Sequence, residues 1–208
     1  MIVTVASYKG GVGKTTSAVH LAERLQQDQP TLLLDGDDTK NATNWGRRGE
    51  KHARKFPFRV ASIERAAMLA REFPHIVIDT GQKPSADDLR EAAEGSDLLI
   101  IPAMPDPLAV DGLGQTLRSL AAMEIKNYRV LVTCVAPDEA KEVAELHELL
   151  KDVAAPHFRT EIPRLKAFKK AAGLGITVRH VDDRQAPRAW AAYNAVGREL
   201  LEVLDGAR

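Results

Sequence analysis

A glycine-rich segment close to the N-terminus carries residue types that bind a polyphosphate. Residues 8–16 read YKGGVGKTT, between an apolar run at 2–6 and a helix-like stretch at 17–22. In such a turn, successive backbone N–H groups and the positive end of the helix dipole point at an anion. Lys14 is expected to reach the β- and γ-phosphates of ATP, and the Thr15 hydroxyl to bind Mg²⁺. The residues expected to surround the nucleotide here are Lys9, Gly10, Gly11, Val12, Gly13, Lys14, Thr15 and Thr16.

Aspartates follow two apolar runs further along the chain. Asp35 and Asp37 come directly after residues 31–34, and the run HIVI at 75–78 ends in Asp79. An apolar strand that ends in aspartate, downstream of a phosphate-binding loop, is the Walker B pattern, in which the carboxylate holds Mg²⁺. We therefore expect Asp79 to lie opposite Thr15 at a magnesium site.

Short apolar runs alternate with longer helical patterns, which is typical of a parallel sheet covered by helices on both faces. The expected strands are residues 2–7, 31–35, 58–61, 75–79, 98–102, 128–135 and 158–162, and the expected helices are 14–27, 63–72, 86–94, 108–124, 138–152, 166–172 and 187–204. Residues 1–208 are interpreted as one α/β domain. Ligands of such folds bind at the carboxyl ends of the strands, so the chemistry should lie just after Ser7, Asp35, Asp79 and Pro102.

The glycine-rich loop departs from the usual G-x-x-x-x-G-K-[ST] pattern. Tyr8 stands where that pattern has glycine, and a second lysine, Lys9, precedes Lys14 by five residues. A lysine at the mouth of the loop is free to point toward a facing subunit. With KGGVGKT at 9–15, the chain resembles the ParA/MinD family of deviant-Walker P-loop ATPases. The resemblance implies a single-domain P-loop NTPase fold and a catalytic role for Lys9 and Lys14, with Lys9 crossing an ATP-sandwich homodimer.

The segment DGDDTKN at 35–41 is similar to the family's D-x-D-P-Q-x-N. The resemblance implies that Asp37 positions or activates the attacking water, that Asp35 lies near the metal, and that Asn41 belongs to the nucleotide site. Asp38 replaces the family's proline, and a second carboxylate beside Asp37 is expected to raise the proton affinity of one of them. An Asp- and Asn-rich turn formed for local hydrogen bonding alone is the alternative.

Two further segments are similar to family motifs. Residues 81–84, GQKP, follow the Walker B aspartate where a γ-phosphate-sensing switch loop is expected, although they depart from the family's D-T-P-P. Residues 98–113 resemble I-P-x-x-P-x-x-L-x-x-x-G-L, whose helix lies at the dimer interface in the family. A proline-punctuated connection between a strand and a helix is the alternative for the second segment.

Positive charge gathers in the C-terminal third, where residues 159–188 contain eight Lys or Arg and three Asp or Glu. The IPR at 162–164 resembles a family segment that grips DNA without reading its sequence, which implies DNA-binding roles for Arg164, Lys166, Lys169 and Lys170. Clustered charge suffices for phosphate contacts. A solvated basic face without a partner is the alternative. A second cluster, 47–55, is expected to form an exposed helix end or loop that adds to the DNA face.

The composition narrows the remaining possibilities. Twenty-nine basic residues balance 29 acidic ones, so any DNA contact must come from local clustering. One cysteine rules out a disulfide framework or a Cys-rich metal site within the chain. Met1 leads straight into the first apolar run, and no run approaches the ~20 residues of a membrane-spanning helix. A cytoplasmic, nucleoid-associated protein without a membrane partner is expected.

The resemblance therefore implies a ParA-type ATPase, using ATP and Mg²⁺, that dimerises on ATP and binds DNA non-specifically. It would segregate or position a cargo, such as a plasmid, a chromosome origin or a carboxysome, and a cargo-associated protein would stimulate hydrolysis. A metabolic P-loop enzyme of the dethiobiotin-synthetase kind is the alternative, and it would be indifferent to DNA.

Overall fold

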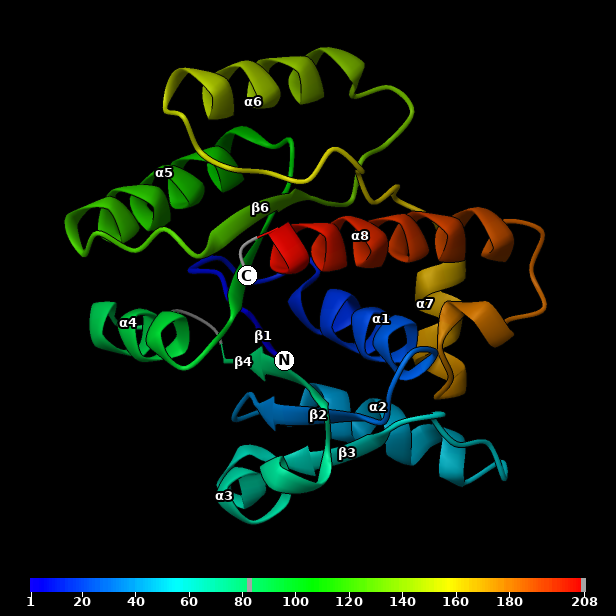
Figure 1. Ribbon diagram of the computed structural model, residues 1–208. Coiled ribbons are helices and arrows are strands. Elements are labelled where there is room, and N and C mark those ends of the chain that lie inside the picture. The colour runs from blue at the N-terminus through cyan, green and yellow to red at the C-terminus, as the bar shows by residue number, and fades with distance from the viewer. Residues whose placement is uncertain (82–83, 207–208) are drawn as a thin grey trace.

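Six of the apolar runs form one parallel sheet in the computed structural model, which describes residues 1–81 and 84–206 (Figure 1). The strands are β1 (Ile2–Val5), β2 (Thr31–Gly36), β3 (Arg59–Ser62), β4 (His75–Thr80), β5 (Leu98–Ala103) and β6 (Tyr128–Val132). Their order across the sheet is β3-β2-β4-β1-β5-β6, and each neighbouring pair is parallel. The carboxyl ends of β1, β2 and β4 therefore lie side by side at one edge of the sheet.

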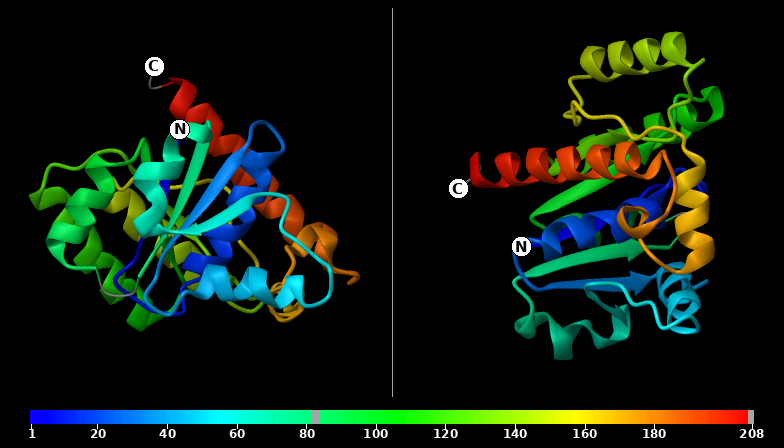
Figure 2. Two further views of the ribbon diagram at one scale, coloured as in Figure 1. Left: turned by 90° about the horizontal axis from the view of Figure 1, so that it is seen from below. Right: turned by 90° about the vertical axis from the view of Figure 1, so that its right-hand side faces the viewer.

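Helices cover both faces of the sheet (Figure 2). They are α1 (Lys14–Gln26), α2 (Asn41–Glu50), α3 (Ala66–Leu69), α4 (Ala86–Glu94), α5 (Pro107–Ala122), α6 (Ala140–Asp152), α7 (Lys166–Leu174) and α8 (Ala186–Gly206). Helices α1, α2, α7 and α8 share one apolar core with the sheet, and α4, α5 and α6 share another. In β5, Leu98 and Ile100 enter the first core while Leu99 and Ile101 enter the second, as alternation along a strand requires. The prediction of an α/β domain with helices on both faces is confirmed.

The predicted strand at 158–162 is wrong. This segment pairs with β6 and its extension at isolated bridges at His157 and Pro163, and the Ile162 N–H donates to the Val132 carbonyl at 2.9 Å. Between the bridges, the backbone N–H groups of Arg159 and Thr160 donate to the carboxylate of Glu199 on α8, at 2.8 and 3.0 Å. Donors that bond a side chain cannot continue a strand ladder, so the segment remains irregular.

Three other elements differ clearly from the prediction. Helix α2 was not predicted, because its buried positions are only Ala42, Trp45 and Gly49 and the rest is polar. The predicted helix at 63–72 is three short pieces, since the backbone at Arg65 (φ −91°, ψ 1°) leaves the α-helical range. Strand β6 ends at Val132 rather than at 135, and Cys134 just beyond it has φ 58°.

None of the helices in residues 1–81 and 84–206 combines the length and apolar character needed to cross a bilayer.

Candidate functional site

The glycine-rich loop between β1 and α1 is held in a fixed shape. Gly11 and Gly13 have φ values of 81° and 83°, which side chains other than hydrogen rarely tolerate. The Gly13 carbonyl accepts the N–H of Ser17 at 2.8 Å, which starts α1. From the end of β6, the Thr133 hydroxyl donates to the Val12 carbonyl at 2.9 Å. The loop backbone is therefore fixed from both sides before any anion binds.

The two lysines of the loop have different surroundings. Lys14 is 7% exposed, and its Nζ lies 3.5 Å from the Lys9 carbonyl oxygen. Burial lowers the pKa of Lys14, while the charges of Asp79 and Asp37 oppose that shift. The Lys9 side chain is 34% exposed, and its Nζ lies 3.4 Å from Oδ1 of Asp106, the N-cap of α5. In this structure Lys9 therefore contacts its own chain, through an aspartate that the sequence analysis missed.

Asp79, next to the last residue of β4, lies opposite Asp35 of β2 and Val5 of β1 in the sheet register. Its side chain is fully buried, and neither carboxylate oxygen has a hydrogen-bond partner among the described residues. Burial raises the pKa of Asp79 to about 7, although the neighbouring Thr15 hydroxyl and the Lys14 charge favour the ionised form. A buried carboxylate without a partner is costly, so the site fits a cation that the protein chain does not itself supply.

Asp35 is buried as completely as Asp79, but its oxygens are occupied. Oδ1 accepts the N–H of Asp37 at 3.2 Å, and Oδ2 accepts the N–H of Thr43, in the first turn of α2, at 2.8 Å. Asp35 thereby folds the loop after β2 and fixes the start of α2. Both contacts are local hydrogen bonds, and each carboxylate oxygen of Asp35 keeps a free lone pair beside Asp79.

Asp37 is held by three hydrogen bonds. Its Oδ1 accepts the N–H and the hydroxyl of Thr39, at 3.0 and 2.8 Å, and its Oδ2 accepts Nδ2 of Asn41 at 2.9 Å. Burial alone would raise the pKa of Asp37, but these bonds and the charge of Lys14 outweigh it and lower the pKa. The proton affinity of Asp37 is therefore lowered rather than raised. The residue stays ionised, and Thr39, which replaces the family's glutamine, helps to fix it.

The side chains of Lys14, Thr15, Asp37 and Asn41 meet in one open cleft of about 400 Å³, whereas Lys9, Asp35 and Asp79 are not among the residues that line it. The cleft is lined by Gly11, Gly13, Lys14, Thr15, Thr16, Asp37, Asn41, Trp45, Arg48 and Ala172. The last three were not predicted, and they come from α2 and α7. Nε of Arg48 donates to the carbonyl of Ala172 at 2.7 Å, which joins the two helices at the rim. In the sequence, Arg48 stood out only as a member of the basic run at 47–55. The position of α2 in the folded chain shows that Arg48 lines this cleft.

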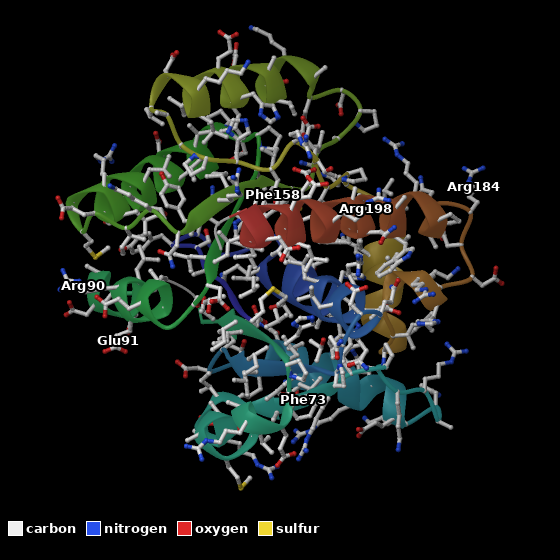
Figure 3. The ribbon with its side chains drawn as sticks, in the orientation of Figure 1. Phe73, Arg90, Glu91, Phe158, Arg184 and Arg198 are labelled. Atoms are coloured by element: carbon white, nitrogen blue, oxygen red, sulfur yellow. The ribbon has the colours of Figure 1, made fainter. Side chains whose placement is uncertain are left out.

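The four residues expected to bind DNA all lie exposed around the start of α7. Arg164 bonds Glu139 at 2.8 Å and the Cys134 carbonyl at 3.0 Å, and the Lys170 ammonium lies 3.7 Å from Asp183. Lys166 and Lys169 form no ion pair within the part of the chain that the structure describes. Arg184, beyond α7, projects from the same side of the molecule (Figure 3).

Two predicted segments remain, residues 81–84 and 98–113. Of the expected switch loop 81–84, Gln82 and Lys83 lie outside the described residues. The segment at 98–113 forms β5 and the first part of α5, with Asp106 at the N-cap and Pro107 at the first helical position. A proline suits that position because its missing N–H would have no helical partner there.

Comparisons with known proteins identify the family of this chain. The model of the CobQ/CobB/MinD/ParA nucleotide binding domain matches residues 3–178. Maintenance of carboxysome distribution protein A of Gloeobacter kilaueensis is 32% identical over 202 residues, which cover 96% of this chain and 93% of the relative.

Two solved structures share the fold at low identity. A McdA variant from Cyanothece, in complex with ATP, superposes with a TM-score of 0.74 at 18% identity, over 96% of this chain and 95% of that one. The MinD cell division protein of Aquifex aeolicus superposes with a TM-score of 0.75 at 18% identity, over 97% of each chain. The arrangement of sheet and helices is therefore that of the MinD and ParA nucleotide-binding proteins.

Proposed function

Because this chain belongs to the CobQ/CobB/MinD/ParA nucleotide-binding family, we propose that it is a ParA-type ATPase that positions an intracellular cargo. One observation carries the proposal: Asp79, buried and without a hydrogen-bond partner among the described residues, lies near the end of β4 beside β1, from which the glycine-rich loop leads to Lys14. An isolated turn for local hydrogen bonding would not require an unpartnered carboxylate at that place.

The residues present fit a nucleotide and Mg²⁺. The loop offers backbone N–H groups and Lys14 to the phosphates, and Thr15 and Asp79, with Asp35 beside them, offer oxygens to the metal. Mg²⁺ would neutralise charge that develops on the phosphates. Within the described residues, no group of three or more His, Cys, Asp or Glu side chains could hold a metal alone. The ion would then depend on phosphate oxygens, so metal and nucleotide would bind together.

Asp37 has the properties needed to orient an attacking water. Its lowered pKa keeps it an acceptor, and Thr39 and Asn41 fix both of its oxygens at the rim of the cleft. Buried Lys14 adds positive charge beside it. In this role Asp37 accepts a hydrogen bond from water and holds it in line, while Asn41 acts through Asp37 as well as lining the cleft.

The dimer is proposed from Lys9. Its partial exposure and its single ion pair with exposed Asp106 leave it able to exchange partners at low cost. In an ATP-bound homodimer, Lys9 would leave Asp106 and balance phosphate charge in the facing subunit. Two copies of the surface formed by Arg164, Lys166, Lys169 and Lys170 would then grip DNA together, and the second contact gains from effective concentration.

The relative from Gloeobacter supports a positioning role, since its name assigns it to carboxysome distribution. We infer that the cargo is a large assembly, either a carboxysome or a plasmid or chromosome origin, and that a cargo-bound protein stimulates hydrolysis. A DNA-bound dimer would be found on the nucleoid. The second candidate is a small-molecule enzyme of the dethiobiotin-synthetase kind, which would be indifferent to DNA.

Retention of the full chain on non-specific duplex DNA, with ATP, with ADP and without nucleotide, tests the proposal. Strong retention is expected with ATP alone, and it should fall steeply with salt. Lys14→Ala should not be retained on DNA, because it should no longer bind ATP. Arg164→Glu with Lys169→Glu should lose it while still forming the ATP dimer, whereas Lys9→Ala should bind ATP and stay monomeric in light scattering. Equal retention in all three nucleotide states would reject the ParA-type role.

A further inference from the structure

A groove of about 590 Å³ lies between α2 and the edge strand β3, on the side of α2 away from the cleft that Lys14 and Asp37 line. Five cationic side chains line it: Lys40, Arg47, Lys55, Arg59 and Arg65. Of the groove-lining residues that the structure describes, only Glu50 carries a carboxylate. The groove therefore has a strong excess of positive charge in a chain whose net charge is zero.

Some of these cations already hold carboxylates at the rim of the groove. Lys40 lies 3.5 Å from Glu64, and Arg59 lies 3.5 Å from Glu72. Glu64 and Glu72 are 66% and 58% exposed, so both ion pairs are weak and easily exchanged. The other three, Arg47, Lys55 and Arg65, are exposed and make no ion pair with any described residue.

The floor of the groove offers backbone as well as charge. Strand β3 is at the edge of the sheet and pairs with β2 alone among the described strands. The outer N–H and C=O groups of an edge strand can pair with an added extended segment. Such a segment would present every second side chain to the groove. An acidic residue at those positions would meet the cations from α2 and from the loop before β3.

The aromatic rings in the groove favour a peptide over nucleic acid. Phe56 stacks on Phe58, with ring centroids 4.8 Å apart, and Phe58 is only 7% exposed. Phe56 also lies against Gly46 of α2, where an added Cβ would stand 3.3 Å from the ring. These rings are already packed against each other and α2, so they offer little surface on which a base could stack.

We propose that this groove binds an acidic, extended segment of a partner protein along β3. Lys40 connects the groove to the loop after β2 that contains Asp37, because Lys40 directly follows Thr39 and forms the N-cap of α2. A partner carboxylate that draws Lys40 away from Glu64 acts next to the turn that holds Asp37. Identifying this partner as the protein that stimulates hydrolysis rests on the proposed function, whereas the binding itself does not.

Fluorescence anisotropy of labelled peptides tests the binding, with the full chain, no nucleotide and low salt. The probe is a peptide of alternating Val and Glu, and its counterparts alternate Val with Gln and Val with Lys. The acidic peptide is expected to bind at least ~10-fold more tightly than either counterpart. Arg47→Glu, Lys55→Glu and Arg65→Glu together should weaken it by at least ~10-fold.

A matched variant controls for net charge. Arg90→Glu, Lys126→Glu and Lys151→Glu change the charge equally at exposed positions outside the groove, and Arg90 projects from α4 across the molecule (Figure 3). That variant should change peptide affinity less than about two-fold, because its substitutions lie beyond the range of unscreened charge in the groove. If the triple groove variant does not fold, as judged by circular dichroism, Lys55→Glu alone replaces it, since Lys55 is exposed outside any helix or strand.

Three outcomes would overturn the proposal. The first is equal affinity for the acidic and basic peptides, and the second is full retention of acidic-peptide binding by the groove variant. The third is loss of single-stranded or duplex DNA binding in that variant while peptide binding persists, which would make the groove a nucleic-acid surface. ATP turnover and ATP-dependent DNA retention of the wild type are measured separately, so failure of the ATPase role is distinguishable from failure of the groove.

Discussion

Asp35 and Asp79 stand opposite each other at the ends of β2 and β4, and both are fully buried. The two carboxylates nevertheless have opposite surroundings. Asp35 accepts two backbone N–H groups, whereas Asp79 accepts none from the described residues. Burial of a charged residue therefore does not identify its role. The state of its hydrogen bonds separates a carboxylate that builds the loop from one that is kept for a ligand.

Of the substitutions at these aspartates, Asp79→Asn is expected to have the largest effect. Turnover of ATP with Mg²⁺ should fall by roughly 1,000-fold, since the metal loses its charged ligand. The free energy of unfolding should stay equal or rise, because an amide is cheaper to bury than a carboxylate. A steady-state ATPase assay and urea unfolding measure the two quantities. The exposed Asp152→Asn serves as control, and wild-type turnover in Asp79→Asn would show that Asp79 is not a ligand.

Asp35→Ala, in contrast to Asp79→Asn, should lower the stability of the protein. Removing both oxygens leaves the buried N–H groups of Asp37 and Thr43 without their acceptor. We expect a loss of about 2–4 kcal/mol in the free energy of unfolding without nucleotide. Urea denaturation of the apo protein measures it, and Asp38→Ala, at an exposed neighbour, should stay within about 0.5 kcal/mol of wild type. Equal stability of Asp35→Ala and wild type would remove the contrast with Asp79.

Asp37→Ala sharpens the comparison by testing the carboxylate that Asp35 positions. Turnover should fall by about 100-fold, because the water loses its acceptor. Binding of ATP should persist, and tryptophan fluorescence can follow it because Trp45 lines the cleft. Thr39→Val, which removes one donor to Asp37 and keeps the backbone bond, should lower turnover less. If Asp38→Ala stops turnover and Asp37→Ala does not, the assignment of this loop is wrong by one residue.

A further expected effect is the contribution of Asp79 to the pH dependence of stability. Its pKa is about 7 in the folded apo protein and about 4 when unfolded, so between these values the unfolded chain binds fewer protons. Stability should therefore fall as pH rises from about 4 to 7, by at most ~1.4 kcal/mol per pH unit, and the loss should stop above 7. Urea unfolding of wild type and Asp79→Asn in EDTA isolates it. Parallel curves for the two proteins would contradict the raised pKa.

Sequence patterns predicted the parts of this site that local chemistry dictates. A turn of glycines before Lys14 needs positive φ, which Gly11 and Gly13 adopt, and the apolar run before Asp79 forms the expected central strand. Six of the seven strands follow from the same kind of apolar run. The seventh failed because Glu199, forty residues away, takes the N–H groups of Arg159 and Thr160. No local pattern in residues 158–162 reports that competition.

Local sequence patterns are sufficient for the fold class, the phosphate-binding loop and the aspartates near the strand ends, because backbone sterics and apolar periodicity act over a few neighbouring residues. The folded arrangement was needed to establish which of those aspartates already accepts hydrogen bonds, that Thr39 and Asn41 hold Asp37, and that Asp106 holds Lys9. It also brought α2 against β3 to form the basic groove. Each of these features depends on which polar groups meet after the chain folds, and hydrogen bonds between distant segments leave no periodic trace in the sequence.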